Sequence, residues 1–257
     1  MKRTVLGIDT ATEVVAIGVG QMQENRVHII ASDDTYSPRA ALSESAPRVS
    51  ALLEQAGLSF GDVDRVVVGL GPGSFTGVRI GVALAKGLAS ALGVPLYELG
   101  TADAVAWRIA ALASEDALVG VVGDAMRGEV YPALFRVGPL EVRRLDHDTV
   151  SKPDVAAKRW ATLGKPVLLT GNGLVKYADI FRAEFNSSAW IAEEHLWLPS
   201  GASLLMAHSA HCETGEIGDG DAAGVLPIYT RLSDAEENER NSASRRRAGG
   251  TGGGHPA

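Results

Sequence analysis

The sequence has a single cysteine, Cys212, among its 257 residues. One thiol excludes an intrachain disulfide, and the residues around it lack the spacing of a metal site. We expect a buried or half-buried thiol in a reducing compartment, and therefore a cytoplasmic protein.

Aromatic residues are few, at 5%, and the formal net charge of −7 leaves no overall basic field that would attract nucleic acid. Any role with RNA is therefore expected to run through a partner. No stretch approaches the roughly 20 apolar residues that a membrane-spanning helix needs. The apolar start is interrupted at Asp9, too early for a signal peptide. We expect no membrane association and no export.

Glycine is abundant, with 30 residues, and the apolar periodicity is strong. In the first half this periodicity predicts three successive strands, a helix, a buried strand, a long helix, a short strand and a further helix beginning near Thr101. Pro47 is expected to kink or restart the first helix. The predicted ranges are 5–9, 14–19, 26–31, 40–56, 65–69, 75–92 and 94–98.

The second half repeats this order. Its predicted strands are 117–123, 129–137, 141–146, 166–170 and 226–229, and its helices are 153–163, 175–184 and 200–212. Two halves of this kind are typical of the actin, Hsp70 and hexokinase-like α/β fold (ASKHA, ribonuclease H-like), with two lobes related by duplication. We assign residues 1–105 to the N-terminal lobe, 106–232 to the C-terminal lobe and 233–257 to a disordered tail.

The most informative segment is the glycine-rich stretch 69–81, which follows a buried strand and opens a helix. It lacks the Gly-Lys-Ser/Thr ending of a P-loop, so its signal as a phosphate cradle is weak. On the helix, small residues recur every four positions in two adjacent rows. Such rows allow another helix to approach closely, either at a subunit interface or inside the chain's own core. The two rows are Gly77, Gly81, Ala85, Ala89 and Ala83, Gly87, Ala91.

Four ordered motifs between residues 5 and 231 resemble the TsaB family, also called YeaZ, with the glycine-rich motif the most specific. They are Ile8-Asp9-Thr10-Ala11-Thr12, then Gly71-Pro72-Gly73-Ser74-Phe75-Thr76-Gly77-Val78-Arg79-Ile80-Gly81 followed by Ala85-Lys86-Gly87-Leu88, then Asp124-Ala125-Met126-Arg127-Gly128-Glu129-Val130-Tyr131, and the weaker Gly171-Asn172-Gly173 with Pro227-Ile228-Tyr229-Thr230-Arg231. The resemblance implies an actin-like, non-catalytic subunit of the bacterial machinery that makes threonylcarbamoyladenosine on tRNA.

The resemblance also implies the partners. They are the paralogue TsaD, which is the threonylcarbamoyl transferase, the small ATPase TsaE, and a second copy of the chain when TsaD is absent, with tRNA reached only through the complex. Pairing is expected through the two helices of the N-terminal lobe, in particular through Leu42, Val49, Leu53, Gly77, Gly81, Ala85 and Ala89. If that face is an interface, Gly81→Arg should fold and fail to pair; if it is internal, the variant should aggregate. Ala41 stands where the family commonly has a histidine.

No catalytic, metal or cofactor residue is assigned with this resemblance. The transferase has two metal-binding histidines four residues apart, and here Thr101 and Val105 fall at those positions. His208 and His211 are three positions apart on a predicted helix. They either bind a metal with a third ligand or are two surface histidines, with the second favoured. The charged hairpin around Asp124 is interpreted as family structure.

Asp9, Thr10 and Thr12 lie where actin-like enzymes hold phosphate and magnesium. They form either a residual nucleotide site or a turn in which the carboxylate caps backbone amides, with the second favoured. Gly171-Asn172-Gly173 is either an adenosine loop or a turn that needs positive φ. The alternative function is therefore an ATP-binding phosphotransferase of the same fold.

Overall fold

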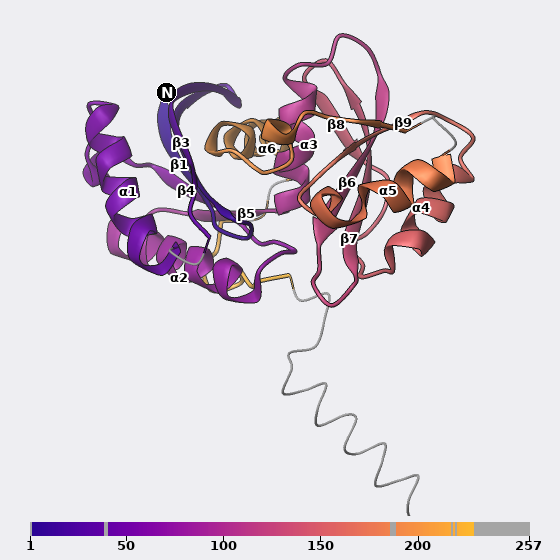
Figure 1. Ribbon diagram of the computed structural model, residues 1–257. Helices are drawn as coiled ribbons and strands as arrows, with labels where there is room; N and C mark the ends of the chain where they lie inside the picture. The colour runs from indigo at the N-terminus through magenta and orange to yellow at the C-terminus, as the bar shows by residue number, and fades with distance from the viewer. Residues whose placement is uncertain (1, 39–40, 186–188, 217, 219, 229–257) are drawn as a thin grey trace, which may run out of the picture.

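The computed structural model describes residues 2–38, 41–185, 189–216, 218 and 220–228 (Figure 1). In the first lobe a five-stranded sheet has the order β3-β2-β1-β4-β5. β1 pairs antiparallel with β2, with Ile8 opposite Ile17, and parallel with β4, with Ile8 beside Val68. The strands are β1 (Arg3–Asp9), β2 (Val14–Gln23), β3 (Arg26–Tyr36), β4 (Arg65–Gly69) and β5 (Leu96–Leu99).

The second sheet repeats this arrangement, with the order β10-β9-β6-β7-β8. Its central strand β6 pairs antiparallel with β7 and parallel with β9, as β1 does with β2 and β4. The predicted actin-like α/β fold with duplicated lobes is therefore confirmed. The strands are β6 (Ala117–Asp124), β7 (Val130–Gly138), β8 (Glu141–Arg144), β9 (Val167–Thr170) and β10 (Ala189–Ile191).

Helices separate and cover the two sheets, which gives the layers seen in Figure 1. α1 and α2 cover the outer face of the first sheet, and α4 and α5 cover the outer face of the second. α3 and α6 lie between the sheets and contact one another. The helices are α1 (Ala41–Gln55), α2 (Phe75–Leu92), α3 (Thr101–Ala110), α4 (Pro153–Ala161), α5 (Leu174–Phe185) and α6 (Gly201–Thr214), with short 3-10 turns at Phe60–Asp62 and Glu194–Leu196.

Strand alternation explains why both faces of the first sheet are buried. Leu6 and Ile8 of β1 join the core under α1 and α2, whereas Val5 joins the central core with Leu204 and Leu205 of α6. The central core also receives β6 and β7 side chains from the second sheet. One continuous hydrophobic layer therefore holds the lobes together, and apolar burial is its main source of stability.

Three expectations need correction. The first helix runs without a break through Pro47. The predicted last strand is not formed at 226–228, and Tyr229 lies outside the described residues, as does the tail 233–257. The assignment of 106–232 to the C-terminal lobe does not match the packing of its last part. α6 packs against β1, β2 and β3, and residues 220–228 return to the first lobe.

Candidate functional site

A cleft of about 930 Å³ lies between the lobes, where the turns at the ends of both sheets meet. The first lobe contributes the β1–β2 turn and the glycine-rich turn before α2. The second lobe contributes the β6–β7 hairpin and the turn before α5. Its lining includes Thr12, Glu13, Phe75, Arg79, Val105, Val121, Asp124, Tyr131, Asn172, Trp197 and Ile228.

Asp9 does not line this cleft, because its side chain is completely buried at the end of β1. Oδ1 accepts a hydrogen bond from the backbone N–H of Ala11 at 2.8 Å, and Oδ2 accepts one from the Thr101 hydroxyl at 2.7 Å. A Cβ on Gly69 would lie 2.0 Å from Oδ2. The carboxylate is therefore enclosed by its own chain, as expected for the capping alternative, and no geometry favours its reaching a magnesium ion.

The glycine-rich turn lies directly on the β1–β2 turn. Ser74 N donates to Ala11 O at 2.7 Å, and a Cβ on Gly73 would lie 2.2 Å from the same carbonyl. Thr10 is buried and donates its hydroxyl to Gly77 O at 2.7 Å. Of the three residues proposed for nucleotide binding, only Thr12 faces the cleft.

Asp9 predicts a measurable pH dependence. Burial raises its pKa to about 6, against the hydrogen bonds from Ala11 and Thr101, which lower it. Because the folded-state pKa lies above the unfolded value of 3.8, ionisation penalises the folded state increasingly between pH 4 and 6. We expect the free energy of unfolding of Asp9→Asn, relative to that of wild type, to increase by about 3 kcal/mol from pH 4 to pH 6. Urea unfolding at several pH values measures this difference.

Asp62→Asn provides the control, since hydrogen bonds from Ser59 lower the pKa of the exposed Asp62 carboxyl below 3.8. Its effect has the opposite sign and develops only below pH 4, so this variant should differ from wild type by a nearly constant amount between pH 4 and 7. A difference between Asp9→Asn and wild type that stays constant from pH 4 to 7 would contradict the assignment to Asp9.

Asn172 joins the two lobes across the cleft. Its Nδ2 donates to Glu13 Oε2 of the first lobe at 2.8 Å, and its Oδ1 accepts from Asp124 N of the β6–β7 hairpin at 2.9 Å. Gly171 has φ +109°, and a Cβ there would lie 2.4 Å from Val122 O. The turn therefore needs glycine for its backbone, and the amide between the glycines has a structural role. No pattern in the sequence predicted the pairing with Glu13, which is 159 positions away.

The small-residue row predicted for the partner interface faces inward. Gly77, Gly81, Ala85 and Ala89 are all buried on α2. A Cβ on Gly81 would lie 2.5 Å from Thr10 Oγ1, so this row receives the end of β1. Within the chain itself these four residues pack inward, as in the alternative of internal packing.

On α1, two of the three residues predicted for the interface also face inward. Val49 and Leu53 are fully buried against the sheet, whereas Leu42 is exposed. Apolar side chains at that helical spacing turned inward because the sheet beneath α1 offers a large apolar face. The outer faces of the two adjacent helices instead carry exposed small residues, among them Ala46, Ser50, Ala51, Ala83, Gly87, Ser90 and Ala91.

α2 is also the one helix of the described residues that is long and apolar enough, by length and composition, to cross a membrane. A buried helix of a protein core passes the same test, and α2 buries its glycine row against β1 and β4. The feature is therefore weak evidence for a membrane.

His208 is not the surface residue that the sequence suggested. It is buried on α6, with Nε2 3.4 Å from Arg65 Nη1 and 3.6 Å from Cys212 Sγ. Burial, and then the charge of Arg65, lower its pKa to about 3, so the imidazole is neutral. The described residues contain no group of three or more histidine, cysteine, aspartate or glutamate side chains that could hold a metal ion.

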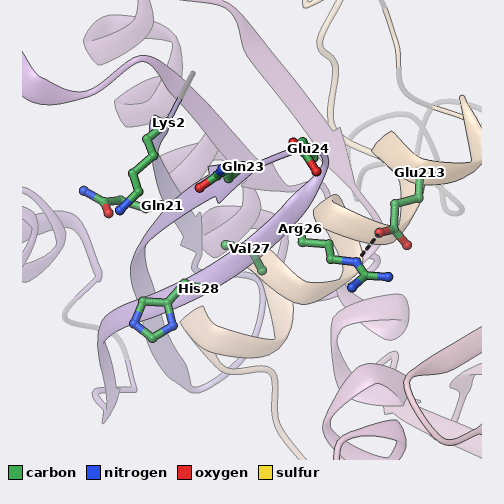
Figure 2. A pocket seen from close by; sticks show the side chains of 8 residues that line it. All are labelled: Lys2, Gln21, Gln23, Glu24, Arg26, Val27, His28 and Glu213. Atoms are coloured by element: carbon green, nitrogen blue, oxygen red, sulfur yellow. Dashed lines mark hydrogen bonds and ion pairs between the residues drawn. The ribbon is translucent and has the colours of Figure 1, made fainter.

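A second hollow of about 700 Å³ lies beside the β2–β3 hairpin and the end of α6 (Figure 2). Arg26 reaches Glu213 across it at 3.4 Å, with the Arg26 side chain largely in solvent and that of Glu213 about half exposed. Lys2, Gln21 and His28 lie apart from this pair in the view. The side chains converge on no common point, so the interlobe cleft and the outer helix faces remain the better candidates.

Comparisons with known proteins agree with this architecture. Residues 37–236 match the family described as TsaD: tRNA N6-adenosine threonylcarbamoyltransferase. A Bacillus subtilis protein named tRNA threonylcarbamoyladenosine biosynthesis protein TsaB is 31% identical over 91% of this chain and 96% of its own length. The Escherichia coli protein of the same name is 28% identical over 78% of this chain and 84% of its own. The solved structure of YeaZ from Pseudomonas aeruginosa superposes with a TM-score of 0.71 at 28% identity, covering 88% of this chain and 99% of that one.

Proposed function

Since this chain belongs to the TsaB family, we propose that it is a non-catalytic subunit in the biosynthesis of threonylcarbamoyladenosine on tRNA, where it holds the transferase TsaD in an active arrangement. TsaE joins the same complex, and a second copy of this chain occupies the TsaD surface when TsaD is absent. The complex acts in the cytoplasm. The net charge of −7 disfavours direct binding of tRNA by this chain, so the partners contact the tRNA.

One observation carries the proposal: the outer faces of α1 and α2 form a surface of small side chains that stays exposed among the described residues. Ala83, Gly87 and Ala91 lie one turn apart along α2, and a Cβ on Gly87 would meet nothing within 4 Å. Small residues allow the backbone of a partner helix to approach closely along such a row. This exposed row replaces the buried one as the expected contact with TsaD.

The proposal assigns no turnover to this chain alone. Thr101, at a position where the transferase has a metal-binding histidine, donates its hydroxyl to the buried Asp9 and accepts from Gly71 N. Val105 is buried and has no atom that ligates a metal. The residues at these positions serve packing, which supports a scaffolding role.

The test is light scattering coupled to size exclusion, with this chain alone and mixed with its cognate TsaD. We expect a stable heteromeric complex for wild type, and for Gly87→Arg a loss of affinity on the order of 100-fold with normal folding, because a long charged side chain would stand in the contact. Val175→Arg is the matched control, since Val175 is exposed on α5, the second-lobe counterpart of α2. Full complex formation by Gly87→Arg would refute the assigned surface, and no complex with wild type would refute the scaffold role.

A further inference from the structure

A buried arginine lies between the first sheet and α6, surrounded by weak hydrogen-bond acceptors. Arg65, at the start of β4, is 6% exposed, and its Nε has no hydrogen-bond partner. Its Nη1 lies 3.4 Å from His208 Nε2, 3.8 Å from Cys212 Sγ and 3.9 Å from Met22 Sδ. The guanidinium also lies over the ring of Tyr97, 5.2 Å from its centroid. No carboxylate of the described residues forms an ion pair with it.

None of these contacts offsets the positive charge of Arg65. His208 is neutral, because burial and then the charge of Arg65 lower its pKa to about 3. Thiol and thioether sulfurs accept hydrogen bonds only weakly. Since a charge removed from water without a counter-ion is costly, a negative charge formed beside Arg65 would be stabilised. Cys212 is the contact that can be converted into a lasting anion, and it is only partly buried.

We propose that Cys212 is an oxidation site for hydrogen peroxide, and that the sulfinate formed there pairs with the buried guanidinium of Arg65. In the first step sulfur attacks a peroxide oxygen, so that an S–O bond forms and the O–O bond breaks. Sulfur is oxidised by two electrons to sulfenic acid, and the peroxide is reduced to water. A second peroxide molecule oxidises the sulfenic acid in the same way to sulfinic acid, which loses its proton to water and leaves the anion.

Two properties of the site decide how this oxidation runs. Burial raises the pKa of the Cys212 thiol, and the charge of Arg65 only partly opposes this, so the reactive thiolate is scarce at neutral pH. The site should therefore respond to sustained peroxide and not to a brief pulse. This sequence has no second cysteine that could resolve the sulfenic acid as an intrachain disulfide, so oxidation can continue to the sulfinate.

This inference is independent of the proposed complex with TsaD. α6 lies on the opposite face of the first sheet from α1 and α2, whose outer faces carry the proposed contact (Figure 1). Loss of the complex and loss of the pairing with Arg65 are therefore separate outcomes.

The first experiment fixes the charge by substitution in the full-length chain. Cys212→Asp places a carboxylate beside Arg65, and Cys212→Asn is the neutral control of matched shape. We expect the unfolding temperature of Cys212→Asp to exceed that of Cys212→Asn by about 3 °C or more at neutral pH. The order should reverse when Arg65→Met is added, because the carboxylate then has no cation to pair with.

A Cys212→Asp chain no more stable than Cys212→Asn would overturn the pairing, and so would the same difference with Arg65→Met present. The comparison of the two Cys212 variants stands even if Arg65→Met does not fold.

The second experiment treats the full-length wild type with hydrogen peroxide above neutral pH and follows each peptide by mass spectrometry. We expect two added oxygen atoms at Cys212, and an unfolding temperature above that of Cys212→Ser treated in the same way. The treated Cys212→Ser chain accounts for oxidation of the methionines, and Met126, which is 61% exposed, reports that the peroxide has acted. A Cys212 that stays unmodified while Met126 is oxidised would overturn the proposal.

Discussion

Gly81→Arg is expected to leave no soluble, folded chain. Even the Cβ of a new side chain at this position would lie 2.5 Å from Thr10 Oγ1, and the rest of an arginine would have to enter the buried contact between α2 and β1. Overpacking of a core costs about 1–3 kcal/mol when neighbours can move, and a buried unpaired charge adds to it. The overpacking and the buried charge together are expected to cost an amount comparable with the whole free energy of unfolding of a domain, about 5–15 kcal/mol. Soluble yield and thermal unfolding measure the effect.

Gly87→Arg, on the same helix and with the same added side chain, is the control. A Cβ there would meet nothing within 4 Å beyond the local backbone of its own helix, so the variant should fold with an unfolding temperature close to wild type. Gly87→Ala should stabilise the chain by about 0.5–1 kcal/mol, because glycine is unfavourable inside a helix. A folded Gly81→Arg would show that α2 does not bury this row.

Gly201→Val is expected to separate α6 from the first sheet. A Cβ at Gly201 would lie 2.1 Å from the carbonyl carbon and oxygen of Ile17, and one at Gly18 would lie 2.4 Å from Gly201 O. Two backbones touch here, so no side-chain rotation can relieve the clash. The shift would also break the hydrogen bond from Gly201 N to Asp34 Oδ1, 2.7 Å long, at the start of the helix. We expect a loss of more than about 3 kcal/mol in the free energy of unfolding.

Ala202→Val is the matched control one position further along α6. Ala202 is only partly buried, so a valine there should cost less than about 1 kcal/mol. Urea unfolding monitored by circular dichroism compares the two variants. Equal stability of Gly201→Val and Ala202→Val would show that the start of α6 does not pack against the backbone of Ile17 and Gly18.

Two features of the site were not decided by the sequence. The motif around Asp9 allowed either a nucleotide site or a capped turn, because a carboxylate after a strand serves both. Its enclosure by Gly69 and Thr101 favours the turn, and these residues are distant in sequence. The contact of Asn172 with Glu13 had no local signal, because a hydrogen bond between lobes leaves no periodicity in either segment.

The sequence by itself determined most of the elements, their order and the duplication, because periodic burial of apolar side chains is a local pattern that each strand and helix must satisfy. It missed the short β10 and predicted a last strand that is not formed at 226–228. It placed α2 at residues 75–92 and found both small-residue rows on it. Only the tertiary structure decided that Gly77 and Gly81 face Thr10 while Gly87 faces out, since both rows are equally small. It likewise decided that α6 packs on the first sheet and that the chain returns to the cleft at Ile228. These outcomes depend on which surfaces remain uncovered once the sheets have formed, and that is a property of the whole fold.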